Sequence, residues 1–277
     1  MKIGNLPTPV YALMVAAVSL VILGVLWWPR STEPSFSPWT RAMPQQQAMI
    51  RGAAQSVAID PGAMELRVDD GLYTNERNEL QTDLEQALAY VANRFGSGLN
   101  APVTTSVILE NGCSLHGVAY TDVRNVQVFT CDAITRGQAV AILAHEMTHQ
   151  LAQDRYGPSH LHADLILSEG VATWAAGRYW LSGKPDFRTY VRDQRRNGVS
   201  YPLATHYAGL GVGAMNALYY QWASFVEFLI NTYGRESFDR LYVSGAGDPG
   251  SADYAGVYGK GLPELELEWS AWIDAAK

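Results

Sequence analysis

The chain has 277 residues, of which 48% are hydrophobic and 17% are charged. This length and composition allow a sizeable buried core, and they exclude an intrinsically disordered chain and a small scaffold that depends on disulfides. The net charge of −7 argues against nucleic acid as a partner, because proteins that bind polyanions carry clustered Lys and Arg.

An uncharged, mostly apolar run of 19 residues lies near the N-terminus, at residues 10–28. At about 1.5 Å per residue, such a run can cross roughly 30 Å of hydrocarbon. The alternative is a cleaved signal peptide, which has a shorter apolar stretch followed by small residues at the cleavage site. Because this run is long and ends in two tryptophans, a proline and an arginine, we expect a transmembrane signal anchor at residues 10–29. A short cytoplasmic tail, residues 1–9, would precede it.

The next segment, residues 30–60, is rich in Ser, Pro and Gln and shows little apolar periodicity. This composition is typical of a linker, here expected outside the cytoplasm. The folded domain is therefore expected to span residues 61–277.

The first half of this domain is predicted to hold one helix and a small sheet. Apolar residues recur at helical spacing over residues 78–95, and Gly96 follows as a stop signal. Residues 103–110 are rich in β-branched side chains and predict a strand. Two further short strands are expected at residues 117–121 and 125–130, around a turn.

The two cysteines of the chain, Cys113 and Cys131, flank the last two predicted strands. A disulfide between them would stabilise the fold by about 3 kcal/mol, and it would favour an oxidising, extracytoplasmic compartment. Two unrelated buried thiols remain the alternative, because spacing cannot prove the pairing.

The second half of the domain is predicted to be mostly helical. Thr135 and Gln138 have the spacing of a capping box at the start of the first of these helices. Apolar periodicity predicts helices at residues 136–152, 164–180, 186–196, 212–233, 236–243 and 263–276. A small sheet followed by helices is an α+β layout.

The most informative segment is His145-Glu146-Met147-Thr148-His149, an H-E-x-x-H pattern within the first of these helices. Residues four apart face the same way on a helix, so both histidines can point at one Zn²⁺, with Glu146 beside them to hold a water. The competing interpretation is two surface histidines and a solvated glutamate, since short patterns also occur by chance.

Two protein ligands leave a catalytic zinc site incomplete, because such sites have three and keep the fourth position for water. Glu169 lies on the next predicted helix, with 19 residues between it and His149. A connecting loop with Gly157 and Pro158 lets that helix run back past the first. We therefore expect one Zn²⁺ per chain, held by His145, His149 and Glu169.

With these residues identified, the sequence resembles the gluzincin zinc metallopeptidases, and more narrowly the compact peptidase MA-like branch related to thermolysin and the M1 aminopeptidases. The resemblance covers roughly residues 103–242. It is carried by the H-E-x-x-H, by Glu169 in an S-E-G-x-A-x-W segment, and by residues 219–229, which look like the family's Y-x-Q-x-x-S-F-x-x-x-L helix.

The resemblance implies a zincin-like fold, in which a small N-terminal mixed sheet lies over the H-E-x-x-H helix and its edge strand pairs with an extended peptide. Residues 125–131 are the expected edge strand. Thermolysin-like members carry an acidic residue where this chain has Thr173, so support for the ligands is expected from elsewhere. No segment like the G-x-M-E-N of M1 aminopeptidases occurs, which favours endopeptidase action.

The expected mechanism follows from these residues. The zinc would lower the pKa of a water toward about 7 and polarise the scissile carbonyl, and Glu146 would take the proton and pass it to the leaving amine. A further donor is expected at the oxyanion. Tyr219 matches the family's tyrosine, and Tyr220 and His206 are the other candidates.

His160 and His162 form a second histidine pair just before a predicted helix. They could bind a second metal, but no acidic residue lies at a matching helical offset, so we interpret them as loop residues.

The leading hypothesis is a membrane-anchored zinc endopeptidase that acts on a peptide or protein outside the cytoplasm. The alternative is a non-catalytic binding or assembly module of the cell envelope that keeps the peptidase fold. A cell-wall peptide hydrolase is a third possibility, which differs in substrate and not in mechanism.

Overall fold

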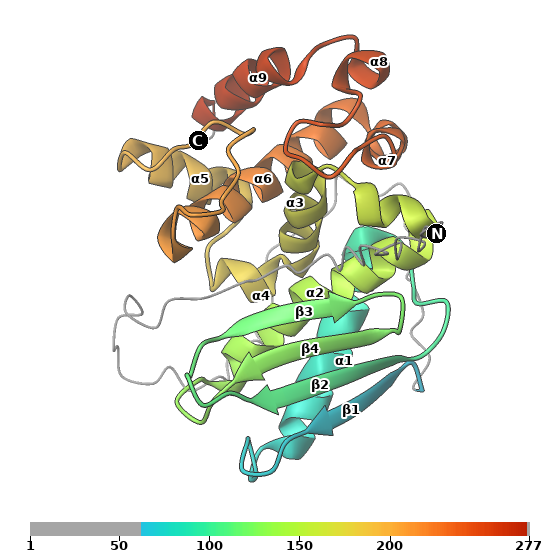
Figure 1. Ribbon diagram of the computed structural model, residues 1–277. Helices are drawn as coiled ribbons and strands as arrows, with labels where there is room; N and C mark the ends of the chain where they lie inside the picture. The colour runs from blue at the N-terminus through green and yellow to red at the C-terminus, as the bar shows by residue number, and fades with distance from the viewer. Residues whose placement is uncertain (1–61, 276–277) are drawn as a thin grey trace, which may run out of the picture.

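The computed structural model describes residues 62–275 of the chain, so the predicted anchor and linker lie outside the described residues. The strands are β1 (Met64–Val68), β2 (Val103–Leu109), β3 (His116–Tyr120) and β4 (Asn125–Thr130). The helices are α1 (Arg77–Phe95), α2 (Arg136–Tyr156), the 3-10 helix η3 (Gly157–His162), α3 (Leu165–Ala176), α4 (Arg178–Leu181), α5 (Phe187–Arg196), α6 (Val212–Tyr233), α7 (Arg235–Tyr242), α8 (Tyr254–Tyr258) and α9 (Leu262–Asp274). This is the predicted α+β fold, with a mixed sheet first and a mostly helical part after it (Figure 1). Among the helices of residues 62–275, none combines the length and the apolar character that a membrane crossing requires.

The four strands lie in the order β1-β2-β4-β3. β1, β2 and β4 run parallel, and β3 pairs antiparallel with β4. The prediction of residues 125–131 as the edge strand is therefore wrong, because β4 lies between β2 and β3. The reason is that β2 pairs with β4 and not with β3, which follows it in the sequence. β3, the other strand of the hairpin, therefore lies at the edge of the sheet. β1 has no counterpart among the predicted strands.

Helix α2 is the centre of the molecule. It packs on β3 and β4, on α1 and on α3, and every residue from 139 to 152 is buried. The capping box is confirmed, since the Thr135 side chain accepts from the backbone N–H of Gln138 and the Gln138 side chain accepts from the N–H of Thr135. The helix runs one turn beyond the predicted end, because Asp154 in that turn pairs with Arg124 at 2.5 Å.

Helix α3 lies between α2 and the long helix α6. A glycine allows the close approach of α3 to α6, because a Cβ at Gly170 would lie 2.8 Å from the carbonyl oxygen of Trp222. The single helix predicted for residues 164–180 is divided in the structure. Gly177 has a positive φ of 47°, a conformation that ends α3 and begins α4.

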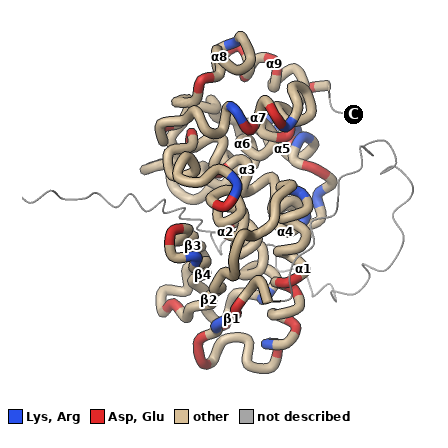
Figure 2. The backbone as a smooth tube through the Cα atoms, turned by 90° about the vertical axis from the view of Figure 1, so that its right-hand side faces the viewer, with Lys and Arg blue, Asp and Glu red and all other residues tan. Residues whose placement is uncertain are grey.

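A disulfide joins Cys113, just before β3, to Cys131, just after β4, with the Cα atoms 5.1 Å apart. This confirms the predicted pairing and fixes the beginning of β3 to the end of its neighbour. Acidic and basic residues are interspersed along the described chain (Figure 2).

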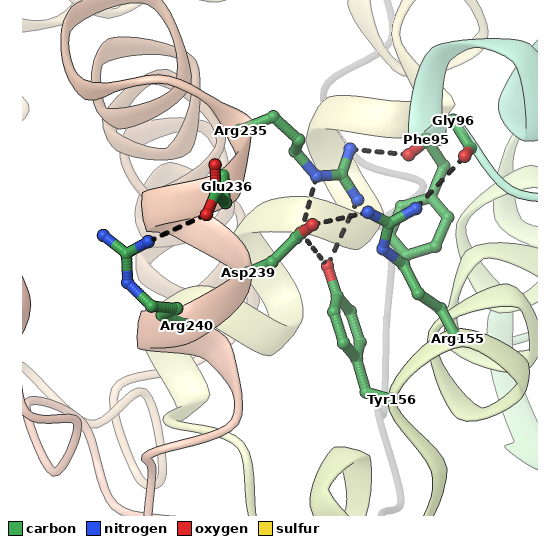
Figure 3. A network of polar contacts seen from close by, with 8 residues as sticks. All are labelled: Phe95, Gly96, Arg155, Tyr156, Arg235, Glu236, Asp239 and Arg240. Carbon is green, nitrogen blue, oxygen red and sulfur yellow. Dashed lines mark hydrogen bonds and ion pairs between the residues drawn. The ribbon is translucent and has the colours of Figure 1, made fainter.

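A network of polar contacts connects the last turn of α2 with α1 and α7 (Figure 3). Asp239 accepts hydrogen bonds from Arg235 at 2.7 Å, from the Tyr156 hydroxyl at 2.6 Å, and from Arg155. Arg235 also donates to the carbonyl oxygen of Phe95 at 2.5 Å. The network joins the sheet-bearing half of the fold to the helical half.

Candidate metal centre

Two helices bring three metal-ligating side chains to one point. His145 and His149 lie one turn apart on α2, and Glu169 comes from α3. The Nε2 atom of His145 is 3.1 Å from Oε2 of Glu169 and 3.3 Å from Nε2 of His149. The Nε2 atom of His149 is 3.8 Å from the same carboxylate oxygen. One donor atom from each residue therefore lies within 4.8 Å of the other two.

All three residues are buried, and the exposed fraction is 4% for His149 and 2% for Glu169. Burial lowers the pKa of His149 to about 3, although the nearby carboxylate of Glu169 opposes this shift. The imidazole of His149 is therefore neutral at physiological pH, which is the form that binds a metal ion.

Thr173 supports one of the imidazoles, contrary to the expectation that support would come from elsewhere. Its Oγ1 is 3.3 Å from Nδ1 of His145, because position 173 lies one turn after Glu169 on α3. The tautomer in which Nδ1 donates to Thr173 leaves a lone pair on Nε2, which faces His149 and Glu169.

Glu146 lies beside the three potential ligands and is also fully buried. Neither of its carboxylate oxygens has a hydrogen-bond partner within residues 62–275. Burial raises the pKa of Glu146 well above its ordinary value, and the negative charge of Glu169 raises it further. A buried carboxylate without a hydrogen-bond partner lowers the stability of the fold, so its presence here indicates a functional role.

These residues fit a divalent cation. Two neutral imidazoles and a carboxylate are the donor set of a catalytic zinc site with one open position. The charge of Glu169 and the unpartnered oxygens of Glu146 would both be favourable near a cation. Within the described part of the chain, His145, His149 and Glu169 form the one such cluster, and they could hold one metal ion.

The structure separates the three candidates for the oxyanion donor. Tyr219 lies at the cluster, with its ring stacked 5.7 Å from that of His145. Its hydroxyl is buried and interacts with the carboxylate of Glu169 and with Tyr207. Tyr220 points away, since its hydroxyl donates to the carbonyl oxygen of Trp180. His206 is exposed, and its Nδ1 accepts from the backbone of Ala208.

Tyr207 is a second tyrosine of the site that sequence reasoning missed. It lies on the loop before α6, and its ring packs edge-on against Tyr219 at 5.8 Å. Burial raises the pKa of Tyr207 to about 12, and the charges of Glu169 and Glu146 contribute to this shift. Its loop has no periodicity, so the only available signal was its place next to His206, a candidate already identified.

His160 and His162 lie in η3 and have different environments. His162 is exposed. His160 is buried, its Nδ1 is 2.8 Å from the Tyr242 hydroxyl, and its ring lies 5.6 Å from that of His149. Neither belongs to the cluster of potential ligands. His160 packs beside His149 and is not the open loop residue that the sequence predicted.

No protein-family model matches this sequence, and a search of the curated proteins finds no match either.

Proposed function

We propose that this protein is a zinc-dependent endopeptidase, anchored in a membrane and active outside the cytoplasm. The observation that carries the proposal is the convergence of His145, His149 and Glu169 next to a buried, unpartnered Glu146. When bound there, zinc would supply a Lewis acid that polarises a carbonyl and lowers the pKa of a water.

The residues around the centre have separate roles in this proposal. His145, His149 and Glu169 hold the metal, and Thr173 orients the ring of His145 through the 3.3 Å contact to Nδ1. The positive charge of a bound cation would oppose the rise in the pKa of Glu146 and favour its carboxylate form. Glu146 would then accept a proton from water and later donate it to the leaving amine.

The phenol groups of Tyr219 and Tyr207 are the proposed donors to the oxyanion. Burial and the nearby carboxylates keep the pKa of Tyr219 well above 10, so its phenol stays protonated and can donate a hydrogen bond. Tyr207 is only partly buried, so its phenol lies closer to the solvent than that of Tyr219.

An extended peptide is the proposed substrate, because the edge of the sheet lies over the helix that carries Glu146. β3 is the edge strand next to β4, the position that was predicted for residues 125–131. It contacts α2 and, within residues 62–275, pairs with a strand on one side only. Its free edge can pair with a peptide main chain.

The location outside the cytoplasm is supported by the disulfide between Cys113 and Cys131, since disulfides persist in oxidising compartments. The membrane anchor remains a proposal from the apolar run at residues 10–28.

A test of the proposal uses the purified full chain and quenched fluorescent peptides whose two ends are blocked. We expect cleavage of these peptides, loss of cleavage after chelation, and its return when zinc is added. Cleavage of blocked peptides identifies an endopeptidase, because an aminopeptidase needs a free N-terminus. A zinc-loaded chain that cleaves neither these peptides nor an unfolded protein such as casein would contradict the proposal.

A further inference from the structure

Gly117 lies on β3 where this strand contacts α2, and it is buried. A Cβ atom built at this position would lie 2.5 Å from Cγ of Glu146, 2.6 Å from its Oε1 and 2.6 Å from Cγ2 of Ile142. Carbon atoms in contact are about 3.5–4.0 Å apart. The main chain of the strand therefore rests directly on the side chain of Glu146, with no room for a methyl group.

The reason for glycine at this position is space and not backbone conformation. Gly117 is absent from the described residues with a positive φ, so any residue could adopt its backbone geometry. A glycine within a strand commonly marks a place where another group approaches closely. Here the approaching group is the side chain that we propose as the general base.

The crowded atoms have little freedom to move away. The Cγ of Glu146 and the Cγ2 of Ile142 are each bonded to a Cβ, so their positions are fixed by the helix and by a single side-chain torsion. The helix itself is buried throughout residues 139–152. It cannot shift without disturbing its contacts with α1 and α3.

Strand β3 is also fixed by its pairing with β4 and by the disulfide. Gly117 is opposite Val128 in the antiparallel pair of β3 and β4, and the disulfide between Cys113 and Cys131 fixes the chain four residues before Gly117. Strand and helix are thus both anchored, and the distance between them at Gly117 is determined by the fold.

We propose that Gly117 is a positioning residue, which lets β3 lie against Glu146 and hold its carboxylate in one place beside His145, His149 and Glu169. This inference rests on the proposed peptidase function. Among residues 62–275, Glu146 has no hydrogen-bond partner to orient it, so its position depends on packing, and the strand supplies a close packing contact. A methyl group at position 117 would displace the strand or the carboxylate by about 1 Å, and a displacement of that size can lower a rate about 100-fold.

The test replaces Gly117 by alanine in the full chain and measures kcat and KM on a blocked, quenched peptide, together with the zinc content and Tm. We expect kcat to fall about 10- to 100-fold, with KM changed less than about threefold and one zinc retained per chain. The matched control is Gly137→Ala on the same helix, where a Cβ would meet nothing within 4 Å. This control is expected to keep the wild-type kcat.

A double-mutant cycle shows whether Gly117 acts through Glu146. In a Glu146→Gln background, Gly117→Ala is expected to cause no further loss of kcat, because the positioned group is already gone. A further loss of tenfold or more in that background would mean that the methyl group acts on the substrate or on the fold, and it would overturn the inference.

A second variant covers the case in which Gly117→Ala folds poorly. Gly117→Ala combined with Ile142→Leu removes the Cγ2 branch at position 142 with little change in side-chain volume, and it leaves the clash with Glu146. We expect the Tm to recover relative to Gly117→Ala, while kcat remains low. A kcat that returns to the wild-type value would show that only packing was affected, and it would overturn the inference.

The two failures can be told apart. If the wild-type chain binds zinc but cleaves no peptide, the proposed function fails and the inference fails with it. If the wild-type chain is active and Gly117→Ala keeps its full kcat, the inference alone fails.

Discussion

Two groups of buried or half-buried polar side chains lie along helix α2, one around Asp239 of helix α7 and one around Glu146 of α2 itself. They differ in how well their charges are matched. At the C-terminal end of α2, Asp239 accepts hydrogen bonds from Arg155, Tyr156 and Arg235 (Figure 3). In the middle of the helix, both oxygens of Glu146 lack any hydrogen-bond partner among the described residues.

The pKa values of the two carboxyl groups shift in opposite directions for this reason. Burial alone would raise the pKa of Asp239, but the charge of Arg235 and the hydrogen bonds outweigh it and lower the pKa. No such partner compensates at Glu146, whose pKa is raised by burial and by Glu169. The matched group at the helix end stabilises the fold, whereas the unmatched group in its middle costs stability, as is common at functional sites.

Glu146→Gln has the largest expected effect, and it tests whether the unmatched carboxyl group serves catalysis. We expect kcat on a quenched peptide to fall about 100- to 10,000-fold, because the general base is removed. The free energy of unfolding of the metal-free protein should stay the same or rise, because an unpartnered carboxyl group is lost. A variant that retains more than a tenth of the wild-type kcat would show that Glu146 is not the general base.

Two tyrosine variants, one in each group of polar side chains, separate an effect on catalysis from an effect on stability. Tyr219→Phe removes a buried hydroxyl at the metal centre, and we expect kcat to fall about 10- to 1,000-fold with little change in Tm. Tyr156→Phe removes a hydroxyl bonded to Asp239 and Arg235, and it should cost about 1 kcal/mol of stability with an unchanged kcat. The reverse outcome, in which Tyr219→Phe unfolds the protein and leaves kcat intact, would make Tyr219 a packing residue.

Asp239→Asn tests the matched group directly. The side chain of Asp239 is 22% exposed, so we expect a loss of about 1–3 kcal/mol in the free energy of unfolding, less than for a fully buried pair. Urea unfolding at neutral pH measures the loss. The zinc content and kcat should not change below the unfolding transition. A loss of zinc would mean that the group around Asp239 is coupled to the metal centre.

Glu227 on α6 is an intermediate case, because its carboxyl group is buried but lies near a compensating arginine. Burial raises the pKa of Glu227 from 4.5 to about 7, although Arg94 opposes the shift. The folded state therefore prefers the protonated form. Its contribution to stability is complete below pH 4.5 and is lost as the pH rises through about 7.

Glu227→Gln should accordingly stabilise the protein by about 1–2 kcal/mol at pH 8, with allowance for the partial exposure of the side chain. It should have almost no effect at about pH 3.5, where both states are almost fully protonated. Urea unfolding at the two pH values measures the difference. An equal effect at both would show that Glu227 does not titrate between them.

The sequence predicted the chemistry of the site better than the arrangement around it. The i, i+4 spacing of His145 and His149 on a capped helix fixes their common direction, and Glu169 on the following helix was found from the need for a third ligand. The burial of these residues on all sides could not be predicted, because it depends on which strands and helices surround α2.

The parts that were missed depend on long-range contacts. The edge position of β3 follows from the pairing of β2 with β4, which the order of the strands in the chain does not reveal. Thr173 looked like a departure from the family pattern, but its hydroxyl reaches His145. Tyr207 and the close approach of Gly117 to Glu146 arise only when a loop and a strand from distant parts of the chain meet at α2.

The most direct test of this account is zinc binding by the chain after chelation and dialysis, measured by calorimetric titration. The account predicts one zinc ion per wild-type chain, and a loss of affinity of about 100-fold or more for His149→Ala and for Glu169→Ala. Asp239→Asn should bind like the wild type. A wild-type chain that binds no zinc, or ligand variants that bind it as tightly as the wild type, would contradict the account.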